Sequence, residues 1–441
     1  MLGQTIQLHE NDREDHAKRL GLTLSEFDRL VTSGNTAYEI IKELGPFYGR
    51  EDSIEPTFRI TAEPVKLPEG SKETLTQLGQ DLLLLGRALK KLPDIYKAIL
   101  GEDLIYSVPP TWRIDTIITE DGKLKVNEIE GQDGASALMI AEQRAYNLQK
   151  FTDSTAAKII PAFEQMCLKP ISGIYKIALI RVNVLNNPCS PNAERFISFL
   201  NTLSNGKIQL EHINEVDIVS GDLKPDWSSY SGVISETTMS PHQIFSYGVK
   251  PEQLISAGNY NTLVNKGIFA IVFEEKLKNF WIENLGEDTY IRLKSILIPS
   301  SFINTRDDLE KARKEGKVVK VFWAGTNTDL INRSRGVALP HGDIEQSSEE
   351  RWKFLGTLLD QGVKLIAQDF VKPALIKSFL RKKGITLEAV EWYNRLCVKY
   401  VADGNPNLET IPNVSLTAME VTLGPDVIPA GRKCAFTAGA F

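Results

Sequence analysis

Four charged side chains with regular spacing flank a single turn in the stretch 110–134, PTWRIDTIITEDGKLKVNEIEGQDG. Two runs of alternating apolar residues surround its Asp-Gly dipeptide, which is typical of a two-residue type I′ hairpin turn. With such a turn, Asp115 faces Glu128 and Arg113 faces Glu130 on one side of the hairpin. Carboxylates that face each other repel, so a fold keeps them there only if something offsets their charge.

A hard divalent cation is one way to offset that charge. Mg²⁺ binds a few carboxylate oxygens and fills its remaining positions with water and nucleotide phosphates. We therefore interpret Asp115, Glu128 and Glu130 as candidate metal ligands, and the alternative is a solvated hairpin with scattered charges. The same register predicts that Ile117 faces Val126 nearer the turn.

Composition limits which proteins this chain can resemble. With 441 residues it is long enough for two or three domains, and 42% hydrophobic with 24% charged residues is ordinary for a soluble globular protein. The net charge of −6 argues against a nucleic-acid or membrane-surface role. The four cysteines are far apart and form no CxxC pair, which argues against a zinc ribbon and a disulfide framework. With no signal peptide or membrane-length apolar run, we expect a cytoplasmic protein.

The first 150 residues are expected to form helices around the hairpin. Leucines at helical spacing predict a long helix over 71–100, and apolar spacing predicts helices within 1–50. The proline-rich stretch 55–70 is expected to be extended. A further helix is predicted over 136–150, and Gly131 and Gly134 leave a corner before it that suits the approach of phosphate.

The character of the sequence changes near residue 151. Strands are predicted at 176–184, 207–217 and 231–237, with a helix at 192–204. Strands that alternate with helices at this spacing favour a small parallel α/β unit. It contains no GxGxxG, so we do not interpret it as a dinucleotide site.

A second series of elements starts near residue 259. A helix is predicted over 259–281 and carries Lys266 near its start. The apolar strand 317–325 contains Lys320 as a candidate functional lysine, and Lys317 is the alternative candidate. The other expected elements are the strand 296–305, the helix 306–315, the polar loop 326–340, the helix 349–361, the strand 363–373, and C-terminal strands that begin with 395–404. The basic run 377–384 is expected to be a solvated helix face.

The order of these motifs resembles the ATP-grasp enzymes. In that fold two lysines reach the ATP phosphates, a flexible loop covers them, and a short hinge receives the adenine edge. Its magnesium half carries Arg-x-Asp and Glu-x-Asn, which here stand first as Arg113-Ile114-Asp115 and Glu128-Ile129-Glu130. The chain is therefore similar to a circularly permuted ATP-grasp protein, broadly of the glutathionylspermidine-synthase-like group. The departure is Glu130, where the family has asparagine.

The resemblance implies a role for each candidate residue. Asp115, Glu128 and Glu130 would hold one or two Mg²⁺ ions, and Arg113 would contact the transferred phosphoryl group or the acyl phosphate. In the covering loop Arg335 would be catalytic and Gly336 would bind the nucleotide. Lys266 and Lys320 would bind the ATP phosphates. Main-chain groups would bind the adenine, namely those of Gln368, Asp369, Phe370 and Val371.

The resemblance also implies an architecture. The fold class would be α+β and α/β, with two ATP-grasp lobes and a small Rossmann-like α/β domain of the kind that precedes the lobes in that family. The metal-binding half would lie in 1–150, the small domain in 151–258, the nucleotide lobe in 259–385, and strands that complete the first lobe in 386–441.

Three functions remain open from the sequence. The first is an ATP- and Mg²⁺-dependent ligase that joins a carboxylate to an amine or thiol through an acyl phosphate. The second is a phosphotransferase on the same fold, and the third is a nucleotide-binding protein without catalysis, which Glu130 favours. Small-molecule carboxylate and amine substrates are expected, with no nucleic-acid or membrane partner, and the chain could form a homodimer.

Overall fold

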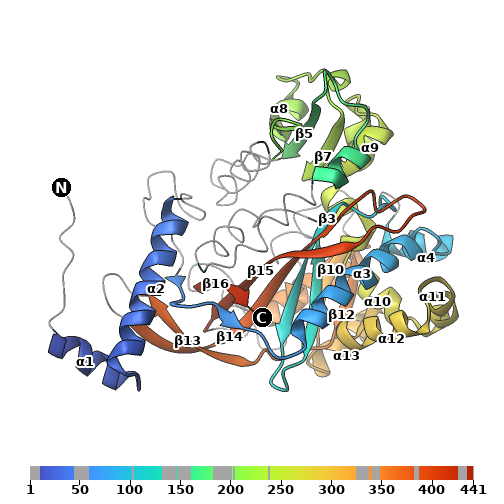
Figure 1. Ribbon diagram of the computed structural model, residues 1–441. Coiled ribbons are helices and arrows are strands. Elements are labelled where there is room, and N and C mark those ends of the chain that lie inside the picture. The colour runs from blue at the N-terminus through green and yellow to red at the C-terminus, as the bar shows by residue number, and fades with distance from the viewer. Residues whose placement is uncertain are drawn as a thin grey trace.

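The computed structural model describes residues 10–43, 59–101, 104–131, 146, 160–181, 201, 204–236, 239–323, 337–339, 348–381, 387–425 and 435–440. These residues form a mixed α/β structure in which helices pack on three separate β-sheets (Figure 1). No helix within the described ranges is long and apolar enough to cross a membrane.

The largest sheet has eight strands and joins distant parts of the chain. Its main path is β1-β16-β15-β14-β3-β4, with β13 beside β14 and β2 beside β16. The strands are β1 (Arg59–Ile60), β2 (Val65–Lys66), β3 (Thr111–Ile118), β4 (Leu124–Glu130), β13 (Leu375–Arg381), β14 (Leu387–Ala402), β15 (Val414–Gly424) and β16 (Ala435–Ala440). Because β14 pairs with β3, the acid-bearing hairpin continues directly into the C-terminal strands.

The leucine-rich helix expected over 71–100 is two helices, α3 (Ser71–Leu89) and α4 (Asp94–Leu100). Pro93 separates them, because proline cannot donate the backbone hydrogen bond that a helix interior requires. The periodic leucines of α3 are buried in the main core as expected, namely Leu75, Leu78, Leu82, Leu85 and Leu89. The helix is fixed against the large sheet where the Tyr400 hydroxyl donates to the Leu75 carbonyl at 2.7 Å.

The second sheet is antiparallel and has the order β11-β10-β12-β9. Its strands are β9 (Ser300–Ile303), β10 (Val318–Trp323), β11 (Val337–Ala338) and β12 (Lys364–Gln368). Helices α13 (Arg306–Lys314) and α14 (Ser348–Asp360) cover one face, which carries Val319, Val321 and Leu365. Alternation along β10 puts Lys320 on the opposite face, where Phe322 packs near α10 (Gly267–Phe273).

The single helix expected over 259–281 is a series of short elements. Two 3₁₀ turns, η3 (Gly258–Tyr260) and η4 (Thr262–Val264), lead to α10, and η5 (Glu275–Leu277), α11 (Lys278–Leu285) and α12 (Glu287–Ile296) follow. Lys266 is the N-cap residue of α10. The Asn265 side chain accepts a hydrogen bond from the Gly267 amide at 2.8 Å, so the turn before the helix is fixed locally.

The third sheet is small and fully parallel, with the order β6-β5-β7-β8. Its elements are β5 (Tyr175–Arg181), β6 (Ile208–Asn214), α8 (Glu215–Ser220), η1 (Trp227–Ser229), β7 (Gly232–Glu236), α9 (Pro241–Ser246), η2 (Pro251–Gln253) and β8 (Leu254–Ser256). It lies at the top of Figure 1, apart from the large sheet. The strands expected near 176, 207 and 231 are confirmed.

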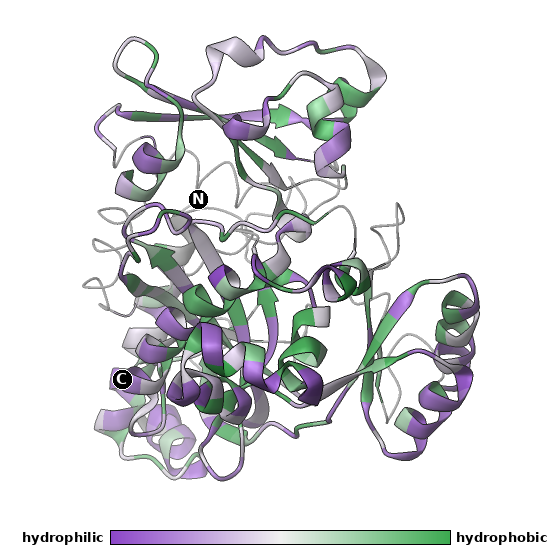
Figure 2. Cartoon of the chain, turned by 90° about the vertical axis from the view of Figure 1, so that its right-hand side faces the viewer, coloured by the Kyte–Doolittle hydropathy of each residue, from purple (hydrophilic) through white to green (hydrophobic). Residues whose placement is uncertain are grey.

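The N-terminal helices pack on a strand that the sequence did not predict. Residues 377–381 of the run 377–384, expected to be a helix face, lie in β13, which pairs antiparallel with β14, and the rest of the run is outside the described residues. This strand therefore belongs to the large sheet, although its residues fall within the range expected for the nucleotide lobe. Helices α1 (Glu10–Arg19) and α2 (Leu24–Glu43) lie beside it, and Arg381 stacks 3.7 Å from the Tyr38 ring. Figure 2 shows the hydrophobic residues concentrated on strands and inward helix faces.

Candidate functional site

The turn of the acid-bearing hairpin contains three residues, so the predicted two-residue turn is wrong. Thr119 and Lys123 close the loop through a backbone hydrogen bond of 2.9 Å, and Gly122 has a φ of 75°. A glycine in this left-handed conformation is typical of three-residue hairpin loops. The Thr119 hydroxyl also accepts from the Lys123 amide at 3.1 Å, a local bond that the dipeptide pattern does not reveal.

The acidic residues nevertheless have the cross-strand partners that the sequence predicts. The longer loop shifts the register by one residue, so Ile117 faces Lys125 and the expected Ile117–Val126 pair is wrong. The register then shifts back between Asp115 and Thr116, where Asn127 is an extra residue on β4. Two differences of one residue therefore cancel, and Asp115 faces Glu128 while Arg113 faces Glu130.

Three carboxylates converge on this face of the hairpin. Asp115, Glu128 and Glu130 each offer an oxygen, and these oxygens lie within 4.8 Å of one another. Arg113 lies between two of them, with its Nε 3.1 Å from an Asp115 oxygen and its other nitrogen paired with Glu130. Asp115 also has Arg395 of β14 on its other side, 3.6 Å away.

Both predicted lysines reach this cluster from other elements. The Lys266 Nζ lies 2.9 Å from a Glu128 oxygen, and the Lys320 Nζ donates to the Asn127 carbonyl at 2.8 Å. The extra residue in β4 therefore provides the acceptor that holds Lys320 beside the acids. Lys317 is directed elsewhere, because it pairs with Glu315 and Asp369 at 3.3 Å each.

The cluster changes the protonation behaviour of its members. Burial raises the pKa of Glu130 to about 7, and the neighbouring acids add to the rise while Arg113 opposes it. Burial also lowers the pKa of Lys320 to about 8. For Asp115 and Glu128 burial acts against ionisation, but the cations beside them outweigh it and hold each pKa below its usual range.

The predicted hinge follows β12 beside the same face. Lys320 pairs with Ile366 across the strands, so Gln368 lies on the same side of the sheet as Lys320. Gln368 is buried, and its side-chain nitrogen has no hydrogen-bond partner. Asp369, Phe370 and Val371 are half-buried beyond it, and the Asp369 amide donates to the Pro299 carbonyl at 2.9 Å.

Some of the predicted features cannot be placed. Arg335 and Gly336 lie outside the described residues, as does Gly134. The helix expected over 136–150 is also outside them apart from residue 146, and so is most of the helix expected over 192–204.

Sequence reasoning missed the charged residues that the C-terminal strands bring to the site. Arg395, Lys399 and Glu420 stand on the acid-bearing face of the large sheet, since Cys397 pairs with Asp115 and Glu420 pairs with Cys397. A signal was present: Arg395 and Lys399 interrupt an apolar strand in the same way as Lys320 does. Only the pairing of β14 with β3 shows that they belong beside the hairpin.

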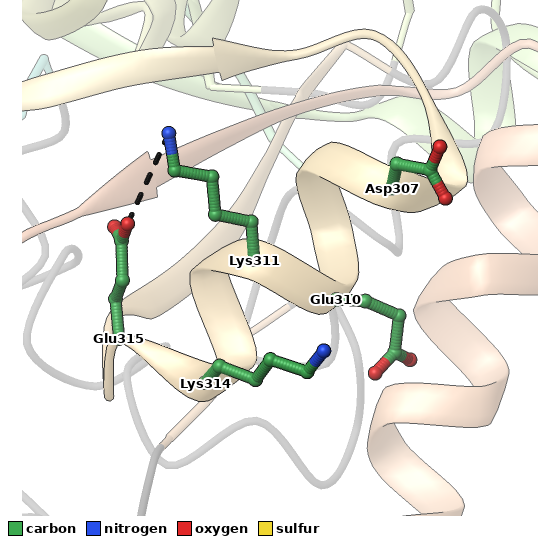
Figure 3. Close-up of a pocket in the computed structure, with 5 residues that line it drawn as sticks. All are labelled: Asp307, Glu310, Lys311, Lys314 and Glu315. Carbon is green, nitrogen blue, oxygen red and sulfur yellow. Dashed lines mark ion pairs between the residues drawn. The ribbon is translucent and has the colours of Figure 1, made fainter.

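A second group of charges lies on α13 and at its C-terminal end, where it lines a surface hollow (Figure 3). Its lining residues are Asp307, Glu310, Lys311, Lys314 and Glu315, and Lys311 pairs with Glu315 at 3.9 Å. Helix α13 covers the face of the second sheet that carries Val319 and Val321. The hollow is therefore on the side opposite Lys320 and does not open onto the acid cluster.

The donor set of the acid cluster fits a hard metal ion. Three carboxylate oxygens at this separation match the oxygen ligands that Mg²⁺ takes, with the remaining positions left for water and phosphate. The nearby lysines and arginines also suit phosphate oxygens. Together the groups favour a phosphorylated ligand that binds with a divalent cation.

Comparison with solved structures shows the fold. A glutathione-synthetase-like effector from Globodera pallida, in the apo form, is 12% identical, with a TM-score of 0.59 over 98% of this chain and 99% of that one. A putative γ-glutamylcysteine synthetase from Methylobacillus flagellatus is 10% identical, with a TM-score of 0.38 over 84% and 86%. An N5-carboxyaminoimidazole synthetase from Staphylococcus aureus, complexed with ADP, is 9% identical, with a TM-score of 0.27 over 59% and 84%.

The first of these likenesses spans nearly the whole of both chains, so this chain shares the fold of that glutathione-synthetase-like effector. No protein-family model matches the sequence, and no curated protein matches it either.

Proposed function

We propose that this chain is an ATP- and Mg²⁺-dependent ligase that joins a carboxylate to an amine or a thiol through an acyl phosphate. The observation that carries the proposal is the convergence of three carboxylates within 4.8 Å, with Lys266 and Lys320 arriving beside them from separate elements. Phosphoryl transfer depends on positioning and charge neutralisation more than on covalent help from the protein, and this cluster supplies both.

Each group has a defined part in this proposal. Asp115, Glu128 and Glu130 would hold Mg²⁺, which when bound would neutralise phosphate charge. Lys266 and Lys320 would bind phosphate oxygens, and Arg113 would bind the transferred phosphoryl group. Main-chain groups of 368–371 would bind the adenine. In the loop that covers the phosphates, Arg335 would be catalytic and Gly336 would bind the nucleotide.

The order of the elements supports a circular permutation. The metal-binding hairpin precedes both phosphate lysines in the chain, and β14, β15 and β16 complete its sheet from the C-terminus. In this proposal 1–150 and 386–441 make one lobe together with β13, and the rest of 259–385 makes the other. The parallel sheet within 151–258 would be the small domain that precedes the two lobes in other members of the fold.

A second candidate, nucleotide binding without turnover, has one observation in its favour. Every acid of the cluster already has a cation from the chain: Arg113 pairs with Asp115 and Glu130, and Lys266 pairs with Glu128. A cluster that is balanced in this way could bind nucleotide without the full set of metal ions.

Thermal-shift titration with ATP tests both candidates. Wild type and Glu128→Gln are each titrated with ATP, with and without Mg²⁺. A ligand at one hundred times its dissociation constant stabilises the native state by about 2.7 kcal/mol, which gives a clear rise in Tm. The proposal predicts a Mg²⁺-dependent rise that the variant loses. Glu391→Gln, an exposed position on β14, is the matched control and should behave as wild type.

The outcomes separate the possibilities. No shift of the wild type with millimolar Mg-ATP would contradict nucleotide binding altogether. A shift that is the same with and without Mg²⁺ would favour binding without turnover. A Mg²⁺-dependent shift followed by ADP release only when both a carboxylate and an amine or thiol are present would support the ligase.

A further inference from the structure

Two lysines from different elements reach neighbouring residues of β4. The Lys266 Nζ lies 2.9 Å from a Glu128 oxygen, and the Lys320 Nζ donates to the carbonyl of the preceding residue, Asn127, at 2.8 Å. Lys266 is the N-cap residue of α10, whereas Lys320 lies within β10. A lysine side chain is flexible, so the place of its ammonium group depends on where its backbone is held. The distance between the two ammonium groups is therefore set by how α10 is fixed against β10.

One buried side chain, that of Asn265, connects these two elements directly. Its Oδ1 accepts from the amide of Gly267, the first residue of α10, at 2.8 Å, and its Nδ2 donates to the Phe322 carbonyl of β10 at 3.4 Å. Asn265 is the residue before Lys266, and Phe322 is two residues after Lys320. The asparagine is 5% exposed, so a shift of α10 along β10 would leave buried polar groups without partners, which is costly.

The same amide also reaches the end of α4. A primary amide has two hydrogens to donate, and the Asn265 Nδ2 also donates to the carbonyl of Leu100, the last residue of α4, at 3.4 Å. The two preceding carbonyls, those of Ala98 and Ile99, accept from the Lys364 Nζ of β12 at 2.6 and 2.9 Å. The last carbonyls of a helix have no partner within the helix, and a cation is favourable beside them. The end of α4 is therefore held from two sides, by Asn265 and by Lys364.

The packing at this junction is equally close. A Cβ atom on Gly267 would lie 2.8 Å from both the Leu100 and the Phe322 side chains. Carbon atoms in contact lie about 3.5–4.0 Å apart, so glycine lets α10 begin this close to α4 and β10. Below the glycine, Ala270 of α10 shares a buried cluster with Phe322 and Ile366 of the second sheet. The start of α10, the end of α4 and β10 therefore form one packed unit around Asn265.

We infer that Asn265 is a positioning residue, which sets Lys266 against Lys320 so that both ammonium groups reach the phosphates of one bound nucleotide. The inference rests on the proposed function, because it takes the two lysines as phosphate ligands. Asn265 acts through the lysines: it holds the first turn of α10 at the Gly267 amide and β10 at the Phe322 carbonyl. Lys364 supports the arrangement by fixing the same end of α4 that Asn265 contacts.

Calorimetric titration of the whole chain with Mg²⁺ and the ATP analogue AMPPNP tests this role in two variants. Asn265→Ala loses all three hydrogen bonds. Asn265→Ser keeps a hydroxyl that can accept from the amide two residues further on, so it preserves the local turn but cannot reach the Leu100 and Phe322 carbonyls. We expect each variant to lose about 10-fold in affinity for Mg-AMPPNP, because the phosphate contacts of both lysines are weakened together.

A double-mutant cycle separates positioning from a general loss of structure. Asn265→Ala is combined with Lys320→Met, and the loss of Mg-AMPPNP affinity that Asn265→Ala causes is measured with and without Lys320. Residues that act as a unit have effects that do not add. The loss should therefore shrink from about 10-fold to about 3-fold when one of the two lysines is absent, because only the other can still be misplaced. Combination with Lys266→Met should give the same result.

Asn394→Ala is the matched control. Asn394 is a fully buried asparagine that also bonds three backbone groups, namely the Ile118 amide and carbonyl at 2.9 and 3.0 Å and the Ala374 carbonyl at 2.8 Å. These bonds lie within the large sheet and involve neither α10 nor β10. Chemical denaturation should therefore show that Asn394→Ala and Asn265→Ala are destabilised alike, whereas Asn394→Ala should bind Mg-AMPPNP as wild type does.

Three outcomes would overturn the inference. Wild-type affinity in Asn265→Ser would mean that only the local turn matters. Additive losses in the double-mutant cycle would mean that Asn265 does not act through the lysines. An equal loss of affinity in Asn394→Ala would reduce the effect to general destabilisation.

A further variant decides if neither Asn265 variant folds. Lys364→Met removes the other support of α4 at a half-buried position and should lose about 3-fold in Mg-AMPPNP affinity, and an unchanged affinity would reject the inference. The proposed function fails separately. A wild type that does not bind Mg-AMPPNP would contradict that function itself, whereas a loss in Lys320→Met with none in Asn265→Ala would reject only the role of Asn265.

Discussion

Two regions of this molecule are rich in ion pairs, and they differ in how much water reaches them. On the acid face of the large sheet, Arg113 and Asp115 have side chains that are 16% and 4% exposed. On α13 and α14, Arg306 and Asp360 form an even closer pair, at 2.6 Å against 3.1 Å, whose side chains are 52% and 58% exposed. Charge density alone would rank the two regions together. Burial and convergence on a common point separate them, and the ligand site that we propose is therefore in the first region.

The largest expected effect concerns the stability of the buried cluster. Arg113→Ala removes the cation between Asp115 and Glu130 and leaves these two carboxylates, whose oxygens lie within 4.8 Å, without it. Removing one partner of a buried ion pair costs about 3–5 kcal/mol of unfolding free energy. Chemical denaturation in EDTA measures this loss, and Arg113→Lys, which keeps the charge but loses the forked geometry, should lose less. A loss below about 1 kcal/mol would mean that the cluster is solvated like the surface pairs.

The next effect distinguishes two lysines that are close in sequence. Lys320→Met removes a buried positive charge beside the predicted phosphate position, and ATP affinity should fall about 10- to 100-fold. Lys317→Met is the matched control: it removes a lysine that pairs with Glu315 and Asp369 instead, so ATP affinity should change less than about 3-fold. Calorimetric titration with Mg-AMPPNP compares them. Equal losses in the two variants would contradict the assignment of Lys320.

The pH dependence of stability should also differ between the regions. Burial raises the pKa of Glu130 to about 7, whereas an unfolded glutamate titrates near about 4.3. Between these values the native state holds a proton that the unfolded state has lost, so stability falls as pH rises through this window. Glu130→Gln should reduce that fall in unfolding free energy by about 1–2 kcal/mol. The reduction is smaller than the full pKa shift would give, because a third of the Glu130 side chain is exposed and water screens its charge.

Denaturation in EDTA from pH 4.5 to 7.5 measures the effect of Glu130. Parallel profiles for wild type and Glu130→Gln would show that this carboxyl titrates normally. Glu349→Gln is a useful control, because the pairing of Glu349 with Arg313 lowers the pKa of that exposed acid. Glu349 should therefore show no such loss of stability over the same range.

The sequence predicted correctly that Asp115 faces Glu128 and Arg113 faces Glu130, but only because two one-residue shifts in strand register cancelled. A dipeptide pattern cannot reveal that the Thr119 side chain closes a longer loop, or that Asn127 is extra on β4. Local periodicity did predict the leucine face of α3 and the strands of the small parallel sheet. It failed for the described part of 377–384, residues 377–381, because the charged residues of β13 form a strand only when β14 is available to pair with them.

The residues missed at the site share the same physical cause. Arg395 and Glu420 are brought to the hairpin by pairing between strands that lie hundreds of positions apart from it in the chain. Their roles depend on which face of the sheet they occupy, and that face is set by register. Spacing within one segment contains no information about a register between distant segments.

The smallest expected effect is at the exposed pair, where the comparison between the two regions can be tested most directly. Arg306→Ala breaks a two-pronged contact with Asp360, with nitrogen–oxygen distances of 3.0 and 2.6 Å. An exposed ion pair of this kind contributes little to stability, because water solvates both charges after the contact is lost. Chemical denaturation should therefore give a loss several-fold smaller than for Arg113→Ala, and the loss should shrink further in high salt. A loss as large as that of Arg113→Ala would show that burial is not what distinguishes the two regions.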